Sequence, residues 1–181
     1  MRLFVALNPD RETRDWIASE QLQIRHQLSM HSRELRWTAP ESLHITLVFL
    51  GEIADPEPVI AALESCPARS LELELGGLGV FPSPRHPTVL WLGCVDLAAV
   101  ALTSFQSAVA DTMRPFVEPE RRAYAPHLTL ARAKPEPRSW LGATVQNLTH
   151  VPRCAWRLDS YVLMCSKTTA AGAQYEVLRE F

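Results

Sequence analysis

The sequence predicts an α+β protein built from two mainly antiparallel sheets. Strand-like and helix-like segments follow one another without the regular alternation of a doubly wound fold, and there is no glycine-rich nucleotide-binding fingerprint. A four-residue motif, histidine–apolar–threonine–apolar, begins at His44 and again at His127, one copy in each half of the 181-residue chain. This duplication predicts two lobes related by a pseudo-twofold axis.

The first half of the chain contains the clearest helical pattern. Ile17, Ile24 and Leu28 fall on one helical face, and Asp10 or Thr13 can cap this helix at its start. The expected elements, in order, are a strand over residues 2–7, a helix reaching about residue 28, a short strand over 33–38, the first motif strand over 44–50 and a helix over 56–66.

In the second half, leucines alternate with glutamates over residues 71–75, which predicts a half-buried antiparallel strand. The glycines at 76, 77 and 79 bend or end it, and three prolines make 81–87 a loop. The remaining expected elements are a buried strand over 88–95, a helix over 97–113, the second motif strand over 126–132, a connector from 134 with a short helix around 139–147, one strand over 154–164, a turn over 168–173 and a closing strand over 174–180. We count about seven strands and three helices, besides the short helix of the connector.

Composition and charge indicate an ordinary soluble globular protein, with 47% apolar residues. The net charge of −2 gives no general attraction for nucleic-acid phosphates, so a nucleic acid would be held locally, at an end or a single nucleotide. The four cysteines lack the close spacing of a zinc or redox motif and predict free thiols. Because neither a signal peptide nor an apolar stretch of membrane length is present, we expect a cytoplasmic protein with no membrane partner.

The two motifs point to proton transfer on an anionic substrate. On a strand, His44 shares a face with Thr46, and His127 shares a face with Thr129, while the apolar residues point into the core. Two facing imidazoles suit an in-line displacement at phosphorus, in which one accepts a proton from water and the other protonates the leaving oxygen. The threonine hydroxyls can hydrogen-bond the non-bridging phosphate oxygens. Neither motif carries an adjacent acid, so we expect no metal and no other cofactor.

The sequence around the motifs resembles a known family. Residues 36–40, 44–51 and 126–132, supported by residues 2–7 and 81–91, look like the 2H phosphoesterase superfamily. Within it, they are most similar to the LigT-like RNA 2′,3′-cyclic phosphodiesterases, also called 2′-5′ RNA ligases. The likeness covers most of the chain. It implies one bilobal domain over residues 1–181, with helices packed outside and the active site in the cleft between the lobes.

The resemblance also implies a reaction, the hydrolysis of a terminal 2′,3′-cyclic phosphate to a 2′-phosphate. By the matching positions, His44 is the proton donor to the leaving 3′ oxygen and His127 the proton acceptor from water. Thr46, Thr129 and Arg132 would bind the phosphate. The expected partners are RNA 3′ ends or nucleotides with a 2′,3′-cyclic phosphate, and we expect a monomer.

Strand parity complicates two candidates near the motifs. Arg132 and Phe49 each lie five residues after a motif histidine, so a regular strand points them away from it. Arg132 therefore needs a bulge or the end of the strand to reach the site, and Phe49 is expected in the core. Trp37, Phe4 and Tyr124 could stack a base, although packing is the default role for each, and Arg121 with Arg122 could meet RNA phosphates or remain solvated.

Two other functions are compatible with the same residues. The site run in reverse would join a cyclic phosphate to a 5′ hydroxyl, which is 2′-5′ ligation. A non-catalytic module that binds nucleotides or RNA ends is the other alternative, although binding alone does not require two titratable groups.

Overall fold

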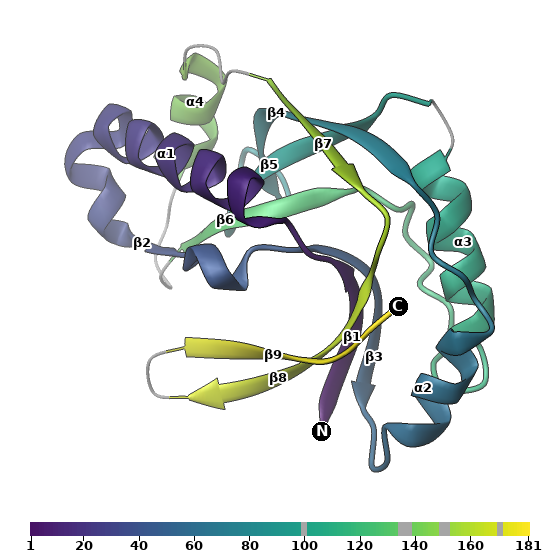
Figure 1. Cartoon of the computed structure of the whole chain (residues 1–181). Helices are drawn as coiled ribbons and strands as arrows, with labels where there is room; N and C mark the ends of the chain where they lie inside the picture. Colours follow the sequence, from purple (N-terminus) through teal and green to yellow (C-terminus); the bar gives the residue numbers. More distant parts are fainter. Residues whose placement is uncertain (99–100, 134–138, 149–152, 170–171) are drawn as a thin grey trace.

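The computed structural model describes residues 1–98, 101–133, 139–148, 153–169 and 172–181, and its strands form one curled sheet (Figure 1). Every pair of neighbouring strands is antiparallel, in the order β7-β4-β5-β6-β3-β1-β8-β9, with β2 also paired to β6. The strands are β1 (Arg2–Leu7), β2 (Leu35–Trp37), β3 (Ile45–Glu52), β4 (Leu71–Phe81), β5 (Val89–Asp96), β6 (His127–Ala133), β7 (Cys154–Leu158), β8 (Val162–Thr169) and β9 (Gly172–Glu180).

The two expected sheets are the two halves of this one sheet. The half β7-β4-β5-β6 and the half β3-β1-β8-β9 are joined at a single residue pair, Ile45 with Leu128. The order strand, helix, motif strand occurs twice, first from β1 to β3, where the short β2 precedes the motif strand, and then from β5 to β6. Each motif strand lies beside the strand that opens its repeat. The α+β class and the approximate twofold relation are therefore confirmed. Because the sheet is continuous, we propose that the chain is a single domain.

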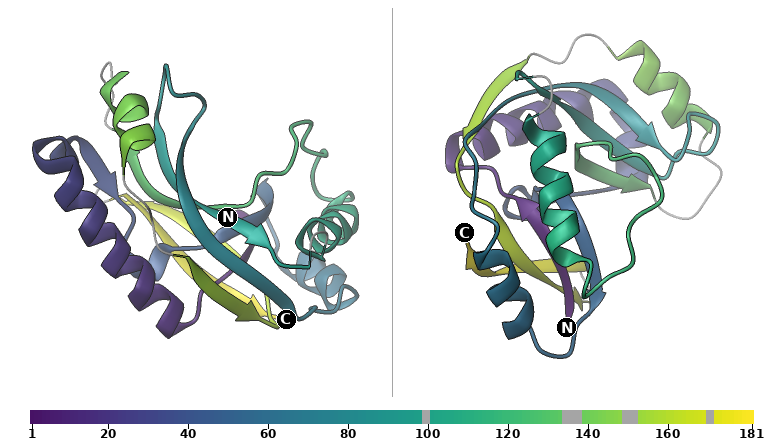
Figure 2. Two further views of the ribbon diagram at one scale, coloured as in Figure 1. Left: turned by 90° about the horizontal axis from the view of Figure 1, so that it is seen from above. Right: turned by 90° about the vertical axis from the view of Figure 1, so that its right-hand side faces the viewer.

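Four α-helices of the described residues pack on the outside of the curl (Figures 1 and 2). The helices α1 (Arg11–Leu28) and α4 (Ser139–Asn147) lie against the β4 and β7 side, whereas α3 (Ala101–Met113) packs on β3 and α2 (Glu57–Glu64) packs on α3. The Asp10 carboxylate accepts a 2.8 Å hydrogen bond from the Thr13 backbone N–H and caps α1 as expected. No helix in the described ranges is long and apolar enough to cross a membrane.

Strand β1 is buried on both faces and so separates two apolar clusters. Leu3, Val5 and Leu7 point to the main core between the sheet and the helices. The alternate residues Phe4 and Ala6 belong to a smaller cluster with Val162 and Met164 of β8, against which Tyr175 of β9 packs. We call this second side of the sheet, which is turned away from the helices, the inner face.

The strand expected over residues 154–164 is wrong, because the chain changes sheet halves within it. β7 pairs with β4, and after residues 159–161 the chain pairs with β1 as β8. Tyr161 fixes this crossing, since its hydroxyl donates to the carbonyls of Leu63 and Cys66 at 2.9 and 2.6 Å. With the short β2, this division raises the strand count from about seven to nine in the described residues.

Strand β4 is longer than the sequence predicts and continues to Phe81. Residues 76 and 77 together face the single position 93 of β5, and Gly77 has a φ of 70°, so a bulge bends the strand without ending it. At Gly79 a Cβ atom would come within 2.1 Å of the Trp91 ring, so the glycine makes room for the indole. The four cysteines are free, as expected. The short helix predicted around residues 139–147 is confirmed as α4. Residues 134–138 of the predicted connector and residues 170–171 of the turn predicted over 168–173 lie outside the described residues.

Candidate active site

The two motif histidines are held in the same way, each at the start of its motif strand. The Nδ1 atom of His44 lies 2.8 Å from the Ser42 carbonyl oxygen, and Nδ1 of His127 lies 2.7 Å from the Ala125 carbonyl oxygen. A carbonyl only accepts, so Nδ1 of each ring donates, and in the neutral imidazole Nε2 is the free acceptor. In each half, the carbonyl belongs to the residue two positions before the histidine. The backbone therefore selects the same tautomer for both neutral rings, with the proton on Nδ1 and with Nε2 free to accept a hydrogen bond.

The seam between the sheet halves brings the two motifs together. Ile45 pairs with Leu128 in an antiparallel register, so the next residues along the chains place His44 beside Thr129 and Thr46 beside His127. Ile45 and Leu128 are fully buried in the main core, whereas the four motif side chains are half-buried on the inner face. Each imidazole thus lies next to the hydroxyl of the other motif.

A bulge follows the threonine in both motif strands and reverses the parity of the residues beyond it. On β3 the register passes from Thr46 to Val48, so Leu47 is the extra residue, and on β6 it passes from Thr129 to Ala131, so Leu130 is extra. Leu130 and Ala131 are both fully buried as a result. The residue that follows, Arg132, is exposed and returns to the face that carries His127 and Thr129.

The same bulge on β3 makes the core assignment of Phe49 wrong. Its side chain is 65% exposed on the inner face, and its ring centroid lies 6.0 Å from that of Phe4. Phe49 and Arg132 occupy equivalent positions in the two halves, each five residues after its histidine. The bulge that brings Arg132 to the face of His127 therefore has an equivalent before Phe49.

Aromatic rings surround each imidazole. The His44 ring lies 4.8 Å from Phe4 and 4.9 Å from Tyr175, and the His127 ring lies 4.9 Å from Phe81 and 6.3 Å from Trp91, measured between centroids. Sequence reasoning missed Tyr175, Phe81 and Trp91 at this site. Their approach depends on strand register and on the space left at Gly79, and neither leaves a local sequence signal.

The three aromatic residues considered for base stacking are packed against the protein. Phe4 is only 2% exposed, and Trp37 lies under the Arg25 guanidinium of α1, 4.7 Å from the ring centroid. Tyr124 is half-buried, and burial raises the pKa of its hydroxyl. The default packing role is therefore confirmed for Phe4 and Trp37.

Burial and charge favour the neutral form of both imidazoles. Burial lowers the pKa of His44 to about 4, and the positive charges of Arg132 and His127 act in the same direction. The pKa of His127 is lowered as well, again mainly by burial and with a contribution from Arg132. In both rings, the hydrogen bond to the backbone carbonyl opposes the shift. Arg132, which lies on the same face as His127, therefore acts electrostatically on both histidines.

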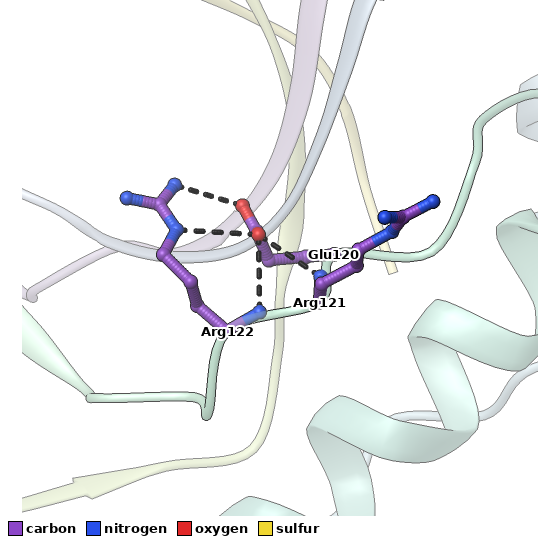
Figure 3. A network of polar contacts seen from close by, with 3 residues as sticks. All are labelled: Glu120, Arg121 and Arg122. Atoms are coloured by element: carbon purple, nitrogen blue, oxygen red, sulfur yellow. Dashed lines mark hydrogen bonds and ion pairs between the residues drawn. The ribbon is translucent and has the colours of Figure 1, made fainter.

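The loop before β6 carries Arg121 and Arg122, both exposed (Figure 3). Arg122 folds onto Glu120, with Nη2 at 2.9 Å from Oε2 and Nε at 3.2 Å from Oε1, and these bonds lower the pKa of Glu120 to about 2. The Arg121 side chain extends away from that carboxylate. Arg122 is thus neutralised within its own loop, as expected of a solvated pair. Among the described residues, no three His, Cys, Asp or Glu side chains are grouped as metal ligands would be.

Known proteins are similar to this chain in sequence. The family model "LigT like Phosphoesterase" matches residues 8–91. An RNA 2′,3′-cyclic phosphodiesterase of Aquifex aeolicus is 30% identical over 152 residues, which are 81% of this chain and 80% of that protein. A protein of the same name from Methanothermobacter thermautotrophicus is 29% identical over 188 residues, covering 100% of this chain and 98% of the relative.

Solved structures have the same fold. The crystal structure of TT0787 of Thermus thermophilus superposes with a TM-score of 0.76 at 24% identity, covering 100% of this chain and 97% of the other. E. coli LigT complexed with 3′-AMP superposes with a TM-score of 0.73 at 22% identity, covering 99% and 96%. Fold and sequence together define a phosphoesterase of the 2H type. This chain belongs to the LigT-like phosphoesterase family, as the motif resemblance implied.

Proposed function

We propose that this chain hydrolyses a terminal 2′,3′-cyclic phosphate of RNA to a 2′-phosphate, by general acid–base catalysis that needs no metal. The observation that carries the proposal is the meeting of two equivalent histidine–threonine pairs at one seam of the sheet. Two relatives that cover most of this chain are named RNA 2′,3′-cyclic phosphodiesterase, which supports the same substrate.

The proposed reaction is an in-line displacement at phosphorus. Nε2 of His127 accepts a proton from water as the water oxygen forms its bond to phosphorus. The bond from phosphorus to the 3′ oxygen breaks on the opposite side, and Nε2 of His44 donates a proton to that oxygen. Afterwards the proton on His127 and the vacancy on His44 are exchanged with solvent, which restores the starting state. The roles follow the family pattern, because a site with twofold symmetry offers either imidazole as the acid.

The phosphate would be held by the neutral and charged donors around the seam. Thr46 and Thr129 can each donate a hydrogen bond to a non-bridging oxygen, where negative charge increases in the transition state. Arg132, on the same face, would neutralise that charge. Binding of the anionic substrate would also help His44 to act as the acid. The negative charge of the phosphate raises the pKa of His44 from about 4 toward a value at which the ring holds a proton.

The test is incubation with a short RNA that ends in a 2′,3′-cyclic phosphate, in excess EDTA, with the product identified by phosphorus NMR. We expect a 2′-phosphate from the wild-type protein, little product from His44→Ala, and a normal rate from His26→Ala, a matched control on the exposed side of α1. Loss of activity in EDTA would contradict the metal-free mechanism. A 3′-phosphate product would reverse the placement of the substrate, and unaltered turnover by His44→Ala would refute the role of the seam.

A further inference from the structure

Two arginines lie directly opposite each other on neighbouring strands beside the candidate site. In the antiparallel register of β2 and β6, Arg36 pairs with Arg132. Residues that face each other in this way share one face of the sheet, with their Cβ atoms about 5 Å apart. Arg36 therefore points to the same side as Arg132.

The neighbours of Arg36 confirm which side this is. Leu35 is 5% exposed and belongs to the main core, and Trp37 packs under Arg25 of helix α1. Both flanking residues thus point toward the helices. Arg36, between them, is exposed and lies on the inner face, which also carries the motif side chains.

Neither of these guanidinium groups has a carboxylate partner in the described part of the chain. Five other surface arginines are ion-paired: Arg11 with Asp15, Arg114 with Asp111, Arg122 with Glu120, Arg153 with Glu74 and Arg179 with Glu64. Exposed arginines such as Arg69, like Arg36 and Arg132, have no such partner among the described residues. Like charges opposite each other in a sheet are unfavourable. A pair that is unfavourable by itself becomes favourable when an anion lies between the two cations.

The position of the pair indicates which anion this is. Arg132 lies three residues beyond Thr129 on β6, which is roughly 10 Å along a strand. β2 pairs with β6 only at residues 131–133, beyond the seam pair Ile45–Leu128. The two opposed arginines therefore lie to one side of the seam, beside the position proposed for the reacting phosphate.

We propose that Arg36 binds the phosphodiester that joins the terminal nucleotide of the substrate to the preceding one, beside the reacting phosphate whose charge Arg132 is proposed to neutralise. The proposal rests on the proposed function, since it assumes that the cyclic phosphate lies at the seam. It makes Arg36 a specificity residue, and it makes an oligonucleotide end a better substrate than a free nucleoside cyclic phosphate.

The experiment compares a nucleoside 2′,3′-cyclic phosphate with a dinucleotide that ends in one, for the wild type, Arg36→Gln and Arg69→Gln. Arg69 is an exposed arginine between α2 and β4 and provides the same change of charge away from the seam. We expect Arg36→Gln to raise KM for the dinucleotide roughly ten-fold, to leave kcat/KM for the nucleoside within about two-fold, and to weaken the salt dependence of KM for the dinucleotide. Arg69→Gln should match the wild type on both substrates.

Calorimetric titration with the 2′-phosphorylated dinucleotide and nucleoside separates this proposal from the proposed function, because it needs no turnover. The wild type should bind the dinucleotide roughly ten-fold more tightly, and Arg36→Gln should lose that advantage. If the wild-type protein hydrolyses neither cyclic phosphate, the proposed function fails and the titration still decides the role of Arg36. An advantage that Arg36→Gln retains, a wild type without one, or an equal loss on both ligands would each overturn the proposal.

Discussion

The two halves of the sheet have the same arrangement of residues around the motif histidine, and they differ at the fifth residue after it. Each half has a histidine bonded to the carbonyl two residues earlier, a threonine two residues later and a bulged leucine after the threonine. Five residues after the histidine, one half has Phe49 and the other has Arg132. The shared parts are those that proton transfer requires. In the proposed mechanism, the position that differs determines where an anion is held.

Burial also differs between the halves. The pKa of His44 falls to about 4, with Phe4 and Tyr175 against the ring, whereas His127 has Phe81 and Trp91 around it and a pKa that is lowered in the same direction. A symmetric backbone therefore supplies two imidazoles, and the side chains around them make the two environments unequal. The predictions below test whether the enzyme uses that inequality.

The largest expected effect is the loss of either imidazole. His44→Ala and His127→Ala should each lower kcat about 10²- to 10⁴-fold, because each removes one side of the proton transfer. The double variant should be little worse than either single one, since the two groups act in the same step. Single-turnover assays on a cyclic-phosphate RNA measure all three. If one histidine variant keeps a normal rate, the two halves do not share the chemistry.

The next largest expected effect is a pH dependence of the free energy of unfolding, which arises from His44. The folded pKa of His44 is about 4 and its ordinary value is 6.5, so between these pH values the unfolded state binds more protons. The free energy of unfolding should therefore be highest above pH 6.5 and fall by up to about 3 kcal/mol as the pH decreases toward 4. Urea unfolding of the wild type and of His44→Gln at pH 7 and pH 4.5 isolates this loss. Equal losses in the two proteins would show that His44 is not buried as a neutral ring.

The position that distinguishes the halves can be tested directly. Arg132→Gln should lower kcat/KM roughly 10- to 100-fold, because it removes a charged donor, whereas Phe49→Leu at the equivalent position should lower it only about three-fold. Arg132 lowers the pKa of both histidines, so its removal raises both values and should shift the pH–rate profile to higher pH. An unshifted profile would separate Arg132 from the histidines.

The smallest effect is expected at the threonines. Thr46→Val and Thr129→Val each remove one neutral hydrogen-bond donor at nearly constant volume, which should lower kcat about three- to ten-fold. The twofold relation predicts similar losses for the two variants. A loss confined to one of them would show that the phosphate lies against one half only. Circular dichroism of both variants controls for folding.

Hydrophobic periodicity and turn signals made the fold class and most elements predictable from the sequence. The duplicated motif supplied four candidate site residues and the family resemblance added Arg132, and their roles stay predictions. The bulges at Leu47 and Leu130 were not predictable, because an extra residue in one strand is defined only by the partner strand. For this reason, the alternation of side chains along a regular strand predicted the wrong face for Phe49, and it allowed Arg132 to reach the site only if a bulge or the end of the strand intervened. The crossing at Tyr161 was missed for a similar reason, since its bonds reach back to residues near position 65. Tyr175 and Trp91 lie beside the histidines because of how their strands pair with the neighbouring strands, which the sequence does not reveal.

The pseudo-twofold that exchanges Thr46 and Thr129 has a stereochemical consequence. The two non-bridging oxygens of a nucleoside 2′,3′-cyclic phosphate are diastereotopic, and the two threonine hydroxyls offer each of them a similar neutral donor. Arg132 has no cationic counterpart at Phe49, so the proposed site presents a charge to one oxygen only. Replacement of one or the other oxygen by sulfur gives two diastereomers, and we expect the difference between their hydrolysis rates to become smaller in Arg132→Gln. One arginine thus breaks the near-twofold symmetry of the proposed site.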